Sequence, residues 1–120
     1  MAAQRITTEQ VRSLMASPQR LKLLDVLPRE SYRLRHIPGA ISLPLDEIDQ
    51  RALQLLDKSD TIVVYCASAA CPDSAAAEEK LLALGFDRVL DYRDGLEGYR
   101  AAGGELQSGF DNTDYSNCGC

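Results

Sequence analysis

The feature that most constrains the fold is a short apolar run that leads through a cysteine into a helical segment. Residues 61–65 read Thr-Ile-Val-Val-Tyr, Cys66 follows at once, and residues 75–84 are rich in alanine and leucine. A short β-branched run of this kind predicts a buried strand, and the stretch after it predicts a helix. Strand, loop and helix in this order form the unit from which parallel α/β sheets are built.

The same alternation extends along most of the chain. Thr7 and Gln10 have the spacing of a capping box, which predicts that a helix begins there and ends before Pro18. The residue pattern predicts further helical segments at residues 44–56, 75–84 and 96–102, and strands at residues 21–26, 41–43, 61–65 and 89–90. Residues 28–35 form a charged segment for which we expect one or two helical turns around Tyr32. We therefore expect an α/β domain over residues 1–104 and a flexible polar tail over residues 105–120.

Composition and charge exclude several classes of partner. The chain has 120 residues, 45% of them apolar, and a net charge of −5, which suits one aliphatic core and argues against binding to nucleic acid or an anionic membrane. No apolar run approaches the roughly 20 residues that span a bilayer, and the N-terminus lacks the core of a signal peptide. We expect a cytoplasmic protein with reduced thiols, for which a monomer suffices.

Cys66 is the first candidate for chemistry. It lies at the carboxyl end of a predicted strand and faces the start of a predicted helix, where amide groups and the helix dipole favour the reactive thiolate. Asp73 near the same helix start opposes this effect, so we expect a modest lowering of the thiol pKa. The loop that would bind the substrate consists of Ala67, Ser68, Ala69, Ala70, Pro72, Asp73 and Ser74. Ser68 and Ser74 have two possible roles: capping the helix, which is the more common, or donating to a bound sulfur species.

Cys71 is the second candidate. Pro72 fits the first position of the helix, which places Cys71 at the N-cap. Cys71 either fills the loop or acts as a partner thiol that attacks a persulfide on Cys66 and leaves a disulfide.

Cys118 and Cys120 form a second pair close to the C-terminus. They are a possible sulfur or electron relay, part of a four-thiolate metal site with the loop cysteines, or incidental thiols. Their spacing differs from that of zinc knuckles, so we assign no metal and no cofactor.

Four segments in the same order resemble the landmarks of single-domain rhodaneses, which are sulfurtransferases. They are residues 23–26, 36–41, 62–66 and 95–99, and the resemblance extends over about residues 5–103. It implies a rhodanese-like fold, with a five-stranded parallel sheet and helices on both faces. It also implies that Cys66 becomes a persulfide and passes its outer sulfur to an acceptor. Asp25 and His36 are read as structural, with Asp25 capping neighbouring backbone and His36 held by hydrogen bonds.

The loop departs from the family pattern in its charge. Between Cys66 and Ser74 there is no cation and one anion, Asp73. This argues against efficient use of anionic thiosulfate, unless an arginine from residues 29–35, Arg93 or Arg100 reaches the site. The partners that we expect are a small sulfur donor or a persulfide-bearing protein, and a thiol acceptor such as a small redox protein.

Two other functions are considered for such a loop, of which the first is disfavoured by the sequence. A thiol phosphatase or arsenate reductase needs an arginine six residues after the nucleophile, where this chain has Pro72. A non-catalytic rhodanese-like module would instead sense redox state through Cys66 and Cys71, or bind a partner protein.

Overall fold

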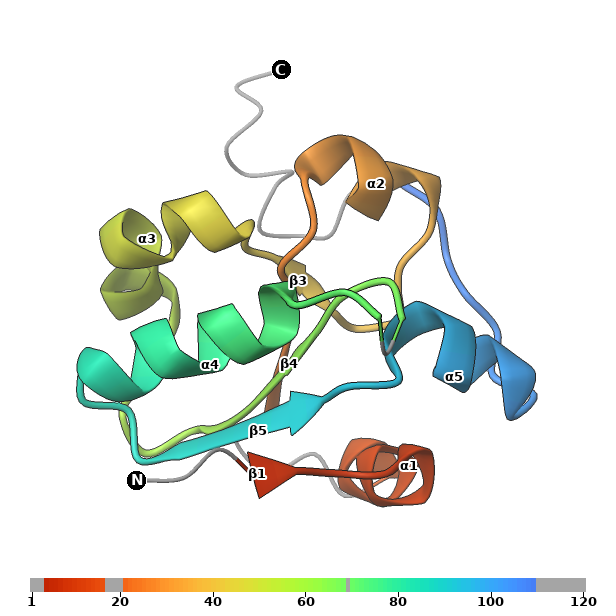
Figure 1. The fold of residues 1–120 in the computed structure, drawn as a ribbon, viewed down its shortest axis with the longest axis horizontal. Helices are drawn as coiled ribbons and strands as arrows, with labels where there is room; N and C mark the ends of the chain where they lie inside the picture. Colours follow the sequence, from red (N-terminus) through yellow and green to blue (C-terminus); the bar gives the residue numbers. More distant parts are fainter. Residues whose placement is uncertain (1–3, 17–20, 69, 110–120) are drawn as a thin grey trace.

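The sheet of the molecule is parallel throughout. The structure, a computed structural model, describes residues 4–16, 21–68 and 70–109 (Figure 1). Five strands lie in the order β1-β5-β4-β2-β3, and every neighbouring pair is parallel. They are β1 (Gln4–Arg5), β2 (Leu21–Asp25), β3 (Ile41–Ser42), β4 (Thr61–Tyr65) and β5 (Arg88–Tyr92). The predicted α/β fold with a parallel sheet is confirmed.

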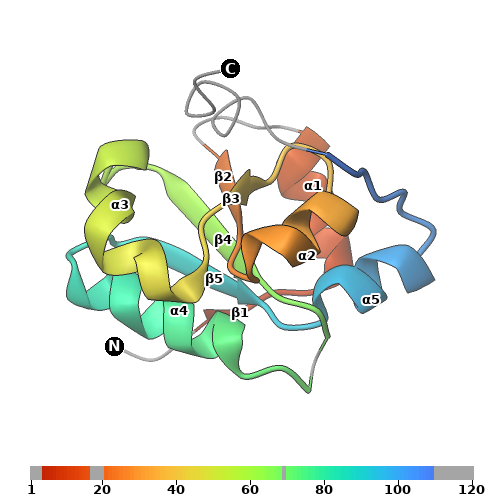
Figure 2. The same ribbon diagram turned by 90° about the horizontal axis from the view of Figure 1, so that it is seen from above.

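Helices cover both faces of this sheet. They are α1 (Thr8–Ala16), α2 (Arg29–Leu34), α3 (Ile48–Leu55), α4 (Asp73–Ala83) and α5 (Gly95–Ala101). Figure 2 shows α3 and α4 on one side of the strands and α1, α2 and α5 on the other. Both faces of the central strands are therefore shielded from water, as their apolar sequences require.

The capping box predicted for the first helix is confirmed. The Gln10 amide donates to the Thr7 hydroxyl at 3.1 Å, and the Thr7 amide donates to the Gln10 side-chain oxygen at 2.8 Å. This reciprocal pair satisfies two amide groups at the start of α1, which have no partner within the helix.

Two elements differ from the sequence predictions. A single helix over residues 44–56 is wrong, because a 3-10 turn, η1 (Leu45–Glu47), precedes α3. The Glu47 amide donates to the Pro44 carbonyl at 2.8 Å, which closes this tighter turn directly after the proline. Strand β1 was not predicted, because its two polar residues carry no strand pattern and only its pairing with β5 defines it.

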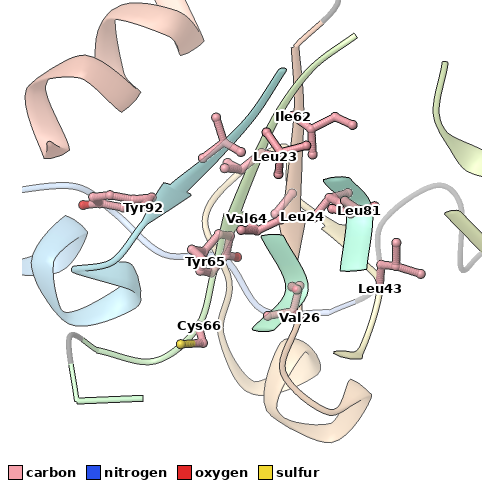
Figure 3. Close-up of a cluster of buried hydrophobic side chains, with 14 of the residues drawn as sticks. Leu23, Leu24, Val26, Leu43, Ile62, Val64, Tyr65, Cys66, Leu81 and Tyr92 are labelled. Atoms are coloured by element: carbon pink, nitrogen blue, oxygen red, sulfur yellow. The ribbon is translucent and has the colours of Figure 1, made fainter. Parts of the chain in front are cut away.

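The core follows the three long strands and ends at Cys66. Leu24, Ile62, Val63 and Val64 have no solvent exposure. Figure 3 shows the cluster running along β2 and β4, with Cys66 at its end. Because the strands are parallel and in register, Asp25 lies beside Tyr65, which lies beside Tyr92. The segments that leave these strands therefore meet at one edge of the sheet, where ligands bind in open α/β folds.

The described part of the predicted tail is attached to the domain. Gln107 and His36 exchange two backbone hydrogen bonds of 2.8 Å, and the Gly109 amide donates to the Arg33 carbonyl at 2.8 Å. Residues 105–109 thus pack beside α2, and residues 110–120 lie outside the described part. Of the helices that the structure describes, none has the length and apolar character needed to cross a membrane.

Candidate functional site

Cys66 lies at the carboxyl end of β4 with its sulfur directed at the loop that follows. Its side chain has no solvent exposure. The sulfur lies 3.4 Å from the Cys71 carbonyl oxygen and 3.9 Å from that of Ser68, so the thiol proton points to backbone acceptors. In Figure 3 the sulfur points out of the apolar cluster. The thiol therefore lies at the end of the core, and its sulfur faces the loop that follows β4.

The loop closes over the thiol through a tight turn. The Cys71 amide donates to the Ser68 carbonyl at 3.0 Å, which brings Cys71 back towards Cys66. Cys71 is only half-buried. The two cysteines predicted to act together are thus brought together, with Cys66 inside and Cys71 nearer to solvent.

The start of α4 differs from the prediction by one residue. Pro72 occupies the N-cap and Asp73 begins the helix, so the placement of Cys71 at the N-cap is wrong. The Pro72 carbonyl accepts the Ala76 amide at 3.2 Å, which makes it the first carbonyl of the helical ladder. No side chain caps this helix, so the capping role predicted for Ser68 and Ser74 is also wrong.

The first turn of α5 holds the loop from its other side. The Leu96 amide donates to the Cys66 carbonyl and the Glu97 amide to the Ala67 carbonyl, both at 3.0 Å. Gly95 permits this approach, because a Cβ atom there would lie 2.2 Å from the Cys66 carbonyl oxygen. Its φ of +61° is also one that residues with a side chain rarely adopt. Sequence reasoning missed this role of Gly95, and the only signal was a glycine at the start of a predicted helix.

The thiol of Cys66 is held in its protonated form. Burial, with a further contribution from the neighbouring Cys71 side chain, raises the pKa of Cys66 to about 11. The amide and hydroxyl of Ser74 oppose this rise without overcoming it. The predicted lowering of the pKa is therefore wrong in this closed arrangement. The start of α4 lowers the pKa of Cys66 through Ser74, as expected, but desolvation of the thiol by the folded loop outweighs this effect.

Ser74 is the polar group best placed to act on the sulfur. It lies in the first turn of α4 and has no solvent exposure. Its hydroxyl interacts with the Cys66 sulfur in a way that lowers the thiol pKa, and it has no other hydrogen-bond partner in the described part of the chain. A buried donor with so few partners is uncommon and calls for an explanation, such as a role in the chemistry of the neighbouring sulfur.

Asp25 and His36 stabilise the backbone near the site. Asp25 accepts the Leu27 amide at 3.0 Å and the Tyr65 hydroxyl at 2.9 Å, which confirms its predicted capping role. Burial raises the pKa of Asp25 to about 7, despite these two hydrogen bonds. His36 is buried, bonds through Nδ1 to the Tyr32 carbonyl at 2.8 Å and stacks on the Tyr32 ring. The prediction of a structural imidazole is confirmed.

The surroundings of the loop carry little positive charge. Four of the five arginines considered as a source of a cation are ion-paired: Arg29 with Glu47, Arg35 and Arg100 with Glu97, and Arg93 with Asp91. A pocket of about 280 Å³ adjoins the first residue of α4. It is lined by Val26, Pro28, Pro44, Leu45, Asp46 and Asp73. A molecule bound there meets apolar surface and two carboxylates.

Some of the predicted site residues fall outside the description. Ala69, Cys118 and Cys120 are not among the described residues, so the relay and four-thiolate hypotheses stay untested. Within residues 4–16, 21–68 and 70–109, no group of three or more histidine, cysteine, aspartate or glutamate side chains is arranged to hold a metal ion.

Comparison with known proteins identifies the fold family. Residues 7–102 match the rhodanese-like domain family. The chain is 33% identical over 91 residues to the putative sulfur carrier protein YrkF of Bacillus subtilis, covering 76% of this chain and 48% of that protein. It is 39% identical over 67 residues to the thiosulfate sulfurtransferase PspE of Escherichia coli, covering 55% of this chain and 62% of PspE. It thus spans less than two thirds of either relative.

A solved structure has the same arrangement of strands and helices. The crystal structure of the Alr3790 protein from Anabaena sp. superposes with a TM-score of 0.82 at 28% identity, covering 94% of this chain and 88% of that one. The sequence and structural matches extend over nearly all of the described residues, including the Cys66 loop. This chain therefore belongs to the rhodanese-like domain family.

Proposed function

We propose that this chain is a sulfurtransferase that carries sulfane sulfur as a persulfide on Cys66 and passes it to a thiol or cyanide acceptor. One observation carries the proposal: the chain places a reduced thiol between a helix start and a loop, beside the Ser74 hydroxyl, which has no other partner among the described residues. The names of relatives such as YrkF and PspE, a sulfur carrier and a sulfurtransferase, support the same class of reaction.

The reaction needs the loop to open. At a pKa of about 11, only about one thiol in ten thousand is ionised at pH 7. Movement of residues 67–73 would remove the Ser68 and Cys71 carbonyls from the sulfur and admit water, and both changes favour the thiolate. The Ser74 amide and hydroxyl would remain on α4 to stabilise the charge.

Charge selects the donor in this proposal. The loop has one charged residue, Asp73, and the adjoining pocket adds Asp46. Doubly charged thiosulfate meets strong repulsion there, whereas a persulfide on a small thiol or on a protein carries less negative charge and meets less repulsion. The acceptor is a thiol, as on a small redox protein, and the reaction suits the reducing cytoplasm.

Turnover with defined donors tests this function. The full chain is incubated with cysteine persulfide or thiosulfate and with cyanide or dithiothreitol as acceptor, and thiocyanate or sulfide is measured. We expect turnover with cysteine persulfide, little with thiosulfate, and a large loss of turnover in Cys66→Ser. A Cys66→Ser variant that turns over at the wild-type rate would exclude the proposed role of Cys66.

A second candidate function is a module that senses redox state without transferring sulfur. The complete burial of Cys66 and its raised pKa favour this alternative, because such a thiol reacts slowly with small donors. Reversible oxidation of Cys66 and Cys71, with no sulfur passed to any acceptor, would support sensing over transfer.

A further inference from the structure

The two loop cysteines differ in their access to solvent. Cys66 has no exposed surface, while Cys71 is half-buried in the same loop. The neighbours of Cys71 on both sides, Ala70 and Pro72, are exposed. A donor that approaches the closed loop therefore meets the Cys71 thiol before that of Cys66.

The two cysteines are also in direct contact with each other. The Cys66 sulfur lies 3.4 Å from the carbonyl oxygen of Cys71, and the Cys71 side chain acts directly on the Cys66 thiol and helps to keep it protonated. The raised pKa of Cys66 keeps this thiol protonated in the closed loop. A buried, protonated thiol is a poor first nucleophile for an external donor.

We propose that Cys71 takes the sulfur from the donor and hands it inward to Cys66. The inference rests on the sulfurtransferase function proposed above and gives the order in which its two thiols act. Cys66 then holds the sulfane sulfur that the acceptor takes in the proposed function.

The two steps balance without an added oxidant or reductant. In the first, the Cys71 thiolate attacks the outer sulfur of a donor persulfide, a sulfur–sulfur bond forms on Cys71, and the donor leaves as its thiolate. In the second, the Cys66 sulfur attacks that same outer sulfur and the bond to Cys71 breaks. The proton of the Cys66 thiol passes to the Cys71 sulfur. This step therefore begins and ends with one persulfide and one thiol.

Sulfur loading is followed over time to test this order. The parent is the full chain with Cys118→Ser and Cys120→Ser, which removes the other two thiols, and Cys66→Ser and Cys71→Ser are made in it. Each protein receives cysteine persulfide, is quenched with an alkylating reagent, and is digested for mass spectrometry. Circular dichroism confirms that each variant is folded.

The relay predicts a distinct result for each protein. In the parent, sulfur appears on Cys71 before Cys66; in Cys66→Ser it stays on Cys71; in Cys71→Ser, Cys66 loads about tenfold or more slowly. Loading of Cys66 at the parent rate in Cys71→Ser overturns the relay but leaves the proposed function intact. A Cys66–Cys71 disulfide with release of sulfide also overturns it. If the parent takes up no sulfur from any donor, both the relay and the proposed sulfurtransferase function are contradicted.

An independent measurement avoids the variants. In the unmodified chain without donor, iodoacetamide should alkylate Cys71 about tenfold or more faster than Cys66 at pH 7. Faster alkylation of Cys66 would contradict the order of access on which the relay depends.

Discussion

Two buried hydroxyl groups at the same edge of the sheet have opposite surroundings. The Tyr65 hydroxyl donates to Asp25 and accepts the Ile37 amide at 3.0 Å, so it is fully engaged. The Ser74 hydroxyl lies beside the Cys66 sulfur with no other hydrogen-bond partner among the described residues. The first belongs to a satisfied network that stabilises the fold, whereas the second is left available. If the proposed function holds, the region after β4 is the functional one and the region after β2 is its support.

The largest effect is expected from a substitution that disturbs the contact between α5 and the Cys66 loop. Gly95→Ala introduces a Cβ atom 2.2 Å from the Cys66 carbonyl oxygen at a φ of +61°. Either α5 or the loop must move, and we expect the free energy of unfolding to fall by about 2–4 kcal/mol, together with loss of sulfur loading. Urea denaturation and loading assays measure the two effects.

Gly103→Ala is the matched control for that change. Its φ is +94°, but nothing lies within 4 Å of the added Cβ atom, so only the backbone conformation costs energy. We expect a loss of about 1 kcal/mol and normal loading per folded molecule. Equal effects of the two substitutions would show that contact with the Cys66 loop is not what Gly95 provides.

The next largest effect is expected from a substitution in the supporting region, where Tyr65 bonds to Asp25 and Ile37. Tyr65→Phe leaves the Ile37 amide and one Asp25 oxygen without their partner in the core, and we expect a loss of about 2 kcal/mol in unfolding free energy. Loading of Cys66 per folded molecule should persist, because the substitution does not touch the thiol. Wild-type stability in urea would contradict the importance of this network.

The ionisation of Asp25 gives the supporting region a pH dependence. Its pKa of about 7 exceeds the ordinary value of 3.8, so the folded state binds a proton that the unfolded state releases. The contribution of this proton to the free energy of unfolding is complete below about pH 4 and is lost as the pH rises through 7. Stability therefore falls over this range. Asp25→Asn should remove this part of the slope, measured as the difference between the two proteins in urea at several pH values. An unchanged slope would contradict the raised pKa.

The smallest effect on stability is expected from a substitution of Ser74, the less engaged of the two buried hydroxyl groups. Ser74→Ala removes a hydroxyl that makes no other hydrogen bond among the described residues, so we expect the free energy of unfolding to change by no more than about 0.5 kcal/mol. Sulfur loading should nevertheless slow by about tenfold, because the sulfur anion loses a donor. The opposite pattern, reduced stability with normal loading, would place Ser74 in the supporting region.

The elements that local sequence determines were predicted well. The strand at residues 61–65 agrees with β4 at both ends, and the capping box and the roles of Asp25 and His36 are confirmed. These depend on short-range patterns or on the family resemblance. The ionisation of Cys66 was predicted wrongly, because burial by the loop and the contact with Cys71 arise only when the chain has folded. The role of Gly95 escaped prediction for the same reason, since its contact is with a strand end far away in the sequence.

The most direct measurement locates the sulfur on the folded protein. The full chain is loaded with cysteine persulfide, passed through a desalting column, alkylated and digested, and the peptide containing Cys66 is analysed by mass spectrometry. We expect one additional sulfur atom on Cys66, which disappears when a thiol acceptor is added. A Cys66 peptide that stays a free thiol with every donor, while the protein is folded and reduced, would contradict it.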